Sequence, residues 1–104
     1  MKVHFLRSVD VHDGKAGQAW EWAFKLVSYT REAFPETKFE VLQPVGGEMN
    51  RIIWFGSFDS LAAYEAYIEK LEADEGYIKR TVEAMEQGLF VATTFKDELY
   101  RVMG

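Results

Sequence analysis

The sequence predicts a single α+β domain with the element order βαββαβ, and three observations support this. The 104 residues provide enough chain for one hydrophobic core and too little for two. Segments with the two-residue period of strands alternate with segments that have the helical period. No repeat, linker or low-complexity segment interrupts this order, so residues 1–104 form one domain.

The first strand is predicted over residues 2–12, where the residues of one parity are apolar and face the helices: Val3, Phe5, Val9 and Val11. Asp13-Gly14 breaks this strand, with Asp13 as the expected N-cap, and a helical period then runs to Phe34, because Pro35 prevents continuation. The helix carries an apolar stripe that covers the sheet, made of Ala16, Trp20, Ala23, Val27, Thr30 and Phe34. Trp22 and Tyr29 extend the apolar surface, so the helix is more apolar than one core requires.

Two further strands are joined by a hairpin. The second strand is predicted over residues 38–45 and the third over residues 51–58, with the glycine-containing segment 46–50 between them. The third strand has four large apolar residues in succession: Ile52, Ile53, Trp54 and Phe55. This run predicts a central strand that is buried on both faces.

The second helix is expected to begin after the N-cap offered by Asp59-Ser60 and to end at Gly88. Its apolar stripe comprises Leu61, Tyr64, Ile68 and Leu71, continued by Ile78, Val82 and Met85. Residues 73–76, Ala-Asp-Glu-Gly, predict a kink or a brief break between the two parts. The fourth strand is predicted over residues 89–95. Residues 99–103 are a short apolar tail that should dock on a partner's sheet edge or on the first helix.

These elements predict a four-stranded antiparallel sheet with both helices on one face. The other face then has no cover, although the strands carry apolar residues at both parities, among them Leu6, Leu42 and either Trp54 or Phe55. Such a patch is larger than a soluble monomer usually exposes. The sequence therefore predicts a homodimer that forms through the open faces.

Composition restricts the classes of function. Twelve Lys and Arg stand against 17 Asp and Glu, which gives a formal net charge of -5, and no basic cluster is longer than a pair. This argues against nucleic acid and anionic membranes as partners. The absence of cysteine excludes disulfides, thiolate metal ligands and cysteine nucleophiles. The first residues are typical of a strand rather than a signal peptide, and the apolar runs are too short to span a bilayer, so we expect a cytoplasmic protein.

Three segments carry a resemblance to a known family: residues 13–23 (DGKAGQAWEWA), 41–47 (VLQPVGG) and 57–65 (SFDSLAAYE). Together they resemble the NIPSNAP-like branch of the dimeric α+β barrel superfamily, which also contains the antibiotic biosynthesis monooxygenase-type domains. Residues 71–77 (LEADEGY) are similar to the family's acidic step before an aromatic residue in the second helix.

The resemblance covers nearly the whole chain and implies a ferredoxin-like subunit whose sheet packs against a partner's sheet around a barrel-like cavity. It implies no single activity, because the relatives include cofactor-less oxygenases, haem-degrading enzymes and dismutase-like enzymes.

Three residues are candidates for contacting a ligand in such a cavity. His4 has the parity opposite to the helix-facing set and should point into the dimer cavity, where it could act as a base or haem ligand; otherwise it is an ordinary polar residue. Arg7 places a charge among the helix-facing positions. It either anchors an anionic ligand or a buried carboxylate, or a bulge turns it outward. Trp54 forms either a flat wall against an aromatic ligand or part of the core.

Other polar residues do not suggest a catalytic centre. His4 and His12 of one chain are about 26 Å apart along an extended strand, which excludes a metal site that they share within one subunit. Asn50, the only asparagine, lies in the hairpin, so the cavity asparagine that some oxygenase relatives use has no clear match. Glu65, Glu69 and Glu72 lie opposite the apolar stripe and indicate a solvated face rather than a metal site. No phosphate-binding loop or nucleophile motif occurs.

Three functions remain open at this point. The first is a dimeric module that binds a small apolar or aromatic molecule in the cavity between the sheets, with His4, Arg7 and Trp54 as contacts. The second is a monooxygenase of the antibiotic biosynthesis type, either cofactor-less or haem-dependent, which would use His4 with Trp54 or Arg7. The third is a structural or interaction module whose cavity is filled by its own side chains.

Overall fold

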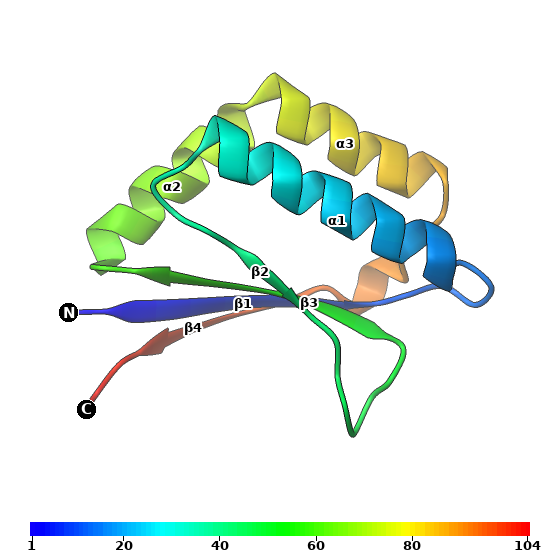
Figure 1. The fold of residues 1–104 in the computed structure, drawn as a ribbon, viewed down its shortest axis with the longest axis horizontal. Coiled ribbons are helices and arrows are strands. Elements are labelled where there is room, and N and C mark those ends of the chain that lie inside the picture. The colour runs from blue at the N-terminus through cyan, green and yellow to red at the C-terminus, as the bar shows by residue number, and fades with distance from the viewer.

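The computed structural model describes all 104 residues and has two layers, a sheet and a set of helices that all lie on one side of it (Figure 1). The elements in chain order are β1 (Val3–Asp10), α1 (Ala16–Ala33), β2 (Glu40–Leu42), β3 (Arg51–Phe58), α2 (Leu61–Ala73), α3 (Glu75–Glu86), the short 3-10 helix η1 (Ala92–Thr94) and β4 (Lys96–Arg101). The sheet order is β2-β3-β1-β4, and every pairing is antiparallel. The predicted fold class is confirmed.

Strand β1 has the predicted orientation, because Val3, Phe5 and Val9 are buried on its helix-facing side. Its register with β3 is unbroken from Val3 opposite Phe58 to Asp10 opposite Arg51, so no bulge occurs. Strand β3 was predicted to be buried on both faces, but it alternates between buried and half-exposed positions. The half-exposed positions face the open side of the sheet, where no helix covers them.

Helix α1 begins at Ala16, after Lys15, and its cap makes no side-chain hydrogen bond, so the prediction of Asp13 as the N-cap is wrong. Its buried residues are Ala19, Ala23, Leu26, Val27 and Thr30. The predicted stripe is therefore correct in its central part, whereas Ala16 at its beginning is exposed. No helix of the structure combines the length and the apolar character that crossing a membrane requires.

The predicted break in the second helix is confirmed at Asp74. This residue ends α2, and its side chain then caps α3 by accepting a hydrogen bond from the Tyr77 N–H at 2.9 Å. Because the helix restarts there, the apolar stripe of α2 does not continue into α3. Ile78, Val82 and Met85 were predicted to be core residues, but they are 44%, 44% and 78% exposed.

The prediction of a fourth strand over residues 89–95 is wrong. Leu89 is fully buried and Phe90 forms only an isolated bridge with Val11, after which the chain makes the η1 turn. The true fourth strand is β4, which contains most of the predicted tail and pairs with β1, with Leu99 opposite Phe5. The tail is thus docked as expected, but on its own sheet rather than on a partner or on α1.

The face of the sheet opposite the helices has no cover in a single chain (Figure 1). Leu6, Ile53 and Phe55 lie on it and are half-exposed, so Phe55 rather than Trp54 faces this side. The loop of residues 43–50 between β2 and β3 projects from the sheet on this same side, away from the helices (Figure 1).

Candidate functional site

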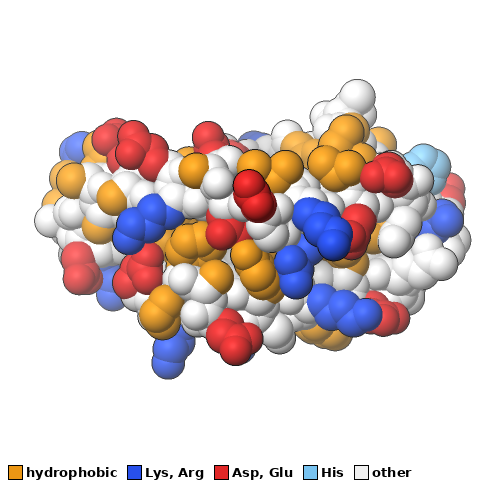
Figure 2. Space-filling model, turned by 90° about the horizontal axis from the view of Figure 1, so that it is seen from above, with side chains coloured by type: hydrophobic (Ala, Val, Ile, Leu, Met, Phe, Trp, Pro, Cys, Tyr) orange, Lys and Arg blue, Asp and Glu red, His pale blue; other side chains and the backbone are white.

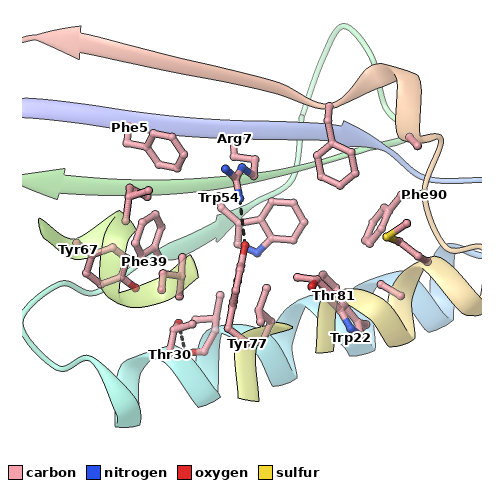
Figure 3. Close-up of a pocket in the computed structure, with 18 residues that line it drawn as sticks. Phe5, Arg7, Trp22, Thr30, Phe39, Trp54, Tyr67, Tyr77, Thr81 and Phe90 are labelled. Carbon is pink, nitrogen blue, oxygen red and sulfur yellow. Dashed lines mark hydrogen bonds between the residues drawn. The ribbon is translucent and has the colours of Figure 1, made fainter. Parts of the chain in front are cut away.

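A cavity of about 290 Å³ lies between the helices and the sheet, and it is the main candidate site (Figure 3). Eighteen residues line it, and 15 of them are hydrophobic. All the main layers contribute: β1 and β3 form its floor, α1, α2 and α3 its roof, and the segment 90–95 one end. The cavity is therefore formed by one chain, on the side of the sheet opposite to the predicted dimer cavity.

The only charged side chain in the lining is Arg7, and it is neutralised by an ion pair. Its Nε and Nη2 atoms donate to the two carboxylate oxygens of Asp97 at 2.6 and 2.8 Å, and its Nη1 atom donates to the Tyr77 hydroxyl at 3.1 Å (Figure 3). The hydrogen bonds from Arg7 to Asp97 raise the pKa of the guanidinium above its usual value. Of the roles predicted for Arg7, pairing with a carboxylate is observed, but Asp97 is exposed rather than buried. The contacts of Arg7 tie β1 to β4 and α3.

An aromatic cluster forms one wall of the cavity. The Trp54 ring packs edge-on against Trp22 and Phe90, with ring centroids 6.2 Å away in both cases. The Trp22 indole N–H donates to the carbonyl oxygen of Arg80 at 3.0 Å, whereas the Trp54 Nε1 atom is buried and has no hydrogen-bond partner. Trp54 is 7% exposed, so it belongs to the core and lines the cavity at the same time.

A second unpartnered polar atom belongs to the cavity lining. Tyr67 is 3% exposed, and its hydroxyl group is buried without a hydrogen bond of ordinary geometry. The neighbouring Thr30 hydroxyl interacts with it only weakly and opposes the effect of burial on the pKa of Tyr67. Burial, assisted by the negative charge of Glu36, raises the pKa of Tyr67 to about 12. An unsatisfied buried donor costs about 1–3 kcal/mol. Trp54 and Tyr67 both line the cavity, so a bound molecule with an acceptor atom could satisfy these donors after a small movement of the two side chains.

The structure brings together Arg7 and Trp54 but not His4. His4 lies on the open face, where its Nδ1 atom is 2.7 Å from the Ser57 hydroxyl and its ring packs against Phe55 at a centroid distance of 5.1 Å. The sequence predicted this face for His4. The cavity of the single chain, however, lies on the other face.

The other polar residues considered from the sequence do not line the cavity. His12 is exposed beyond the end of β1, and the Asn50 amide holds the β2–β3 loop by donating to the Val11 carbonyl at 2.5 Å. Glu65, Glu69 and Glu72 are exposed on α2. No group of three or more His, Cys, Asp or Glu side chains is placed to hold a metal ion.

Sequence reasoning missed three residues of the cavity. Trp22 was recognised only as surplus apolar surface on α1, and that surplus was the available signal. Tyr67 falls outside the stripe predicted for α2. Tyr77 was noted only as the aromatic residue that ends segment 71–77, and its place in the cavity depends on where α3 restarts. Their roles follow from the packing of helices that the apolar pattern did not orient correctly.

Solved structures of similar fold cover almost the whole chain. A NIPSNAP family protein from Agrobacterium tumefaciens has a TM-score of 0.80 at 11% identity, covering 99% of this chain and 94% of its own. An uncharacterised NIPSNAP domain protein from Burkholderia xenovorans has a TM-score of 0.78 at 13% sequence identity, and the match covers 99% of this chain and 95% of that protein. SnoaB, a cofactor-independent oxygenase from Streptomyces nogalater, has a TM-score of 0.69 at 13% sequence identity, and the match covers 99% of this chain and 94% of SnoaB.

The fold is therefore that of the NIPSNAP and antibiotic biosynthesis monooxygenase-type proteins, and the resemblance inferred from the sequence is confirmed at that level. No protein-family model matches the sequence, and no curated protein is similar to it in sequence. Sequence identities this low show a shared fold only, so the activity has to be inferred from the site itself.

Proposed function

We propose that this chain binds a small, uncharged, apolar or aromatic molecule that carries a hydrogen-bond acceptor, in the cavity between its helices and its sheet. The observation that carries this proposal is the pairing of an apolar cavity with two orphan donors, Trp54 Nε1 and the Tyr67 hydroxyl. Ligand sites are typically apolar clefts in which a few polar groups fix the orientation of the ligand.

The charges of the cavity favour a neutral ligand. Arg7 would attract an anion if it were free, but Asp97 already accepts hydrogen bonds from two of its nitrogen atoms. An anionic ligand would have to compete with this carboxylate, and a cationic ligand would meet the guanidinium without compensation. A carbonyl or ether oxygen would satisfy the free donors without any charge being buried.

The cavity supports binding better than proton transfer. Its lining has no histidine and no carboxylate, and its one guanidinium is paired, so no side chain is poised as a general base. A volume of about 290 Å³ is at the small end of the range of ~300–1,000 Å³ for ligand sites and suits one or two fused rings. Haem does not fit this cavity, because the macrocycle is larger and the predicted ligand His4 lies on the other face of the sheet.

The proposal includes a homodimer that forms through the open face of the sheet. Leu6, Ile53 and Phe55 are half-exposed there, and no element of the chain covers them. Polar groups such as the His4–Ser57 pair lie among them, which is common in interfaces. A cavity between the two sheets stays a prediction, and the ligand site proposed here does not depend on it.

The binding proposal is tested with two probes of closely similar shape, 2-acetylnaphthalene and 2-isopropenylnaphthalene, of which only the first carries an acceptor. We expect calorimetry to show that the ketone binds more tightly than the hydrocarbon, by roughly fivefold for each donor it satisfies. Tyr67→Phe and Trp54→Phe should each reduce this preference. Trp20→Phe is the matched control, because Trp20 packs against Phe24 and does not line the cavity.

Two results would contradict the binding proposal. One is that neither probe binds to the wild-type protein. The other is that both probes bind with equal affinity to the wild type and to the Tyr67→Phe variant, because the orphan hydroxyl would then have no part in recognition.

A further inference from the structure

The mouth of the cavity is rimmed by apolar side chains that are in water in a single chain. Among the residues that line the cavity, Met85 is 78% exposed and Phe95 is 51% exposed, and the small residue Ala92, which lies between them in the sequence, is exposed as well. These residues place the opening between the end of α3 and the segment before β4. Figure 2 shows hydrophobic side chains interspersed with charged ones over the helical side of the molecule. These two large side chains give the mouth of the cavity an apolar rim that a partner could cover.

A second set of apolar side chains without neighbours lies on the β2–β3 loop. Val45 is 97% exposed and Met49 is 59% exposed, whereas the tips of such loops usually carry polar turn residues. The base of the loop is fixed, because the Val11 N–H donates to the Asn50 carbonyl oxygen at 2.9 Å and the Asn50 amide donates back to Val11. The loop therefore presents two apolar side chains from a fixed base.

The loop and the cavity mouth lie at the same end of β1, on its two flanks. On one flank, Arg51 at the loop base donates to the Asp10 carboxylate at 2.8 Å. On the other flank, the Asp10 N–H donates to the Thr94 hydroxyl at 2.9 Å, and the Val91 N–H donates to the Asp10 carbonyl at 2.9 Å. Within one chain the loop projects from the open face while the mouth is on the helical side, so the loop does not cover its own mouth (Figure 1).

Consider two copies packed with their open faces together and related by a two-fold axis that runs parallel to the strands. This axis places the β2 side of one sheet opposite the β4 side of the other sheet. It would place the loop of each copy beside the β4 edge of the other copy, at the end of the sheet where the mouth opens. The loop projects in the direction of a second copy packed on the open face, and its apolar tip is complementary to the apolar rim.

We propose that in the homodimer the β2–β3 loop of one copy closes the cavity of the other, with Val45 and Met49 packed over Met85 and Phe95. The inference rests on the dimer proposed above. It makes the binding site a shared one, because the floor and roof of each cavity come from one copy and its cover comes from the other.

The absence of cysteine makes cross-linking a direct test. Val45→Cys protein is mixed with Phe95→Cys protein, left to exchange subunits, and treated with a short bismaleimide. The matched control is Val45→Cys mixed with Glu69→Cys, because Glu69 is exposed on α2, away from the mouth. We expect covalent dimers that contain both variants in the first mixture and none in the control.

Sedimentation of the same variants, together with the binding of 2-acetylnaphthalene to Val45→Asp, separates the possible failures. A dimer that yields no cross-link between Val45→Cys and Phe95→Cys overturns the shared cover and leaves the dimer intact. A monomer at micromolar concentration overturns the dimer and the cover together. Val45→Asp should weaken binding of the probe by roughly tenfold in a protein that is still dimeric, and unchanged affinity would also overturn the inference.

Discussion

Replacing Gly56 with alanine should destabilise the protein, although the same exchange usually stabilises a strand. Gly56 faces the helices from β3, and an added Cβ would lie 2.8 Å from the Cε1 atom and 2.9 Å from the Cζ atom of Phe39. Phe39 is 7% exposed, and its ring packs against Phe5, Phe58 and Tyr67 at centroid distances of 6.0, 6.1 and 5.4 Å. The ring also lines the cavity, so giving way to the new Cβ would shift it from three aromatic neighbours.

The expected magnitude is the difference of two effects. Overpacking of a core costs about 1–3 kcal/mol, and alanine recovers about 0.5–1 kcal/mol of the conformational cost of glycine in a strand. We expect a net loss of about 1 kcal/mol, which corresponds to a melting temperature lower by roughly 4–8 °C for a domain of this size. Thermal unfolding followed by circular dichroism measures this directly.

Two companion variants decide whether the reasoning is correct. Gly17→Ala in α1 has no atom within 4 Å of the new Cβ, so it should raise the melting temperature by the helix propensity alone. In a Phe39→Leu background the clash is removed, and Gly56→Ala should become neutral or stabilising. A Gly56→Ala protein as stable as the wild type, or one whose loss persists in the Phe39→Leu background, would refute the assignment of the cost to Phe39.

Three further predictions address other parts of the molecule. Gly76→Ala should lower the melting temperature, because its Cβ would lie 2.5 Å from the Tyr29 Cζ atom and displace the hydroxyl that donates to Asp74, and the loss should vanish when Tyr29 is also replaced by alanine. Tyr67 should make stability fall as the pH rises from about 10 to about 12, because the unfolded side chain ionises at its ordinary pKa of 10.0 while the folded one stays neutral up to about 12. Urea unfolding across this range should therefore decline less steeply for Tyr67→Phe than for the wild type, and parallel curves would contradict the burial of this hydroxyl. Leu6→Glu should give monomers or aggregates in sedimentation, since a dimer through the open face would bury an unpaired carboxylate at a cost of several kcal/mol; an intact dimer of this variant would place the interface elsewhere.

The sequence was sufficient for those parts of the fold in which an apolar pattern has a single explanation. The parity of β1 assigned Val3 and Phe5 to the helices and His4 to the open face, and the small and acidic residues at 73–76 located the break at Asp74. In both cases the pattern is local, because neighbouring residues alone determine the pleat of a strand or the end of a helix.

The fourth strand was misplaced because burial and strand formation leave the same apolar signal. Leu89 and Phe90 are apolar because they pack into the core as irregular chain, whereas β4 is an edge strand rich in charged residues. Charged edges oppose the pairing of strands from different molecules, so a true edge strand does not have to read as apolar. A similar limit applied to α3, where the restart at Asp74 changed which residues face inward.

The candidate site was only partly accessible to sequence reasoning. Arg7 and Trp54 could be selected because a charge or an indole in the middle of a strand is unusual. The orphan state of the Trp54 and Tyr67 donors could not be predicted, because it depends on which atoms fail to meet across three packed helices. A sequence pattern carries no information on whether a buried donor meets a hydrogen-bond acceptor in the folded chain.

The ion pair between Arg7 and Asp97 joins residues that are 90 positions apart, and this separation affects how the protein is made. During synthesis β1 emerges early, but its edge on the β4 side stays open until almost the whole domain has left the ribosome. Pairings of such long range are slow to form and leave a strand edge exposed to other nascent chains. We therefore expect the polar end of the cavity, where Arg7 meets Asp97, to be the last part of the domain to form.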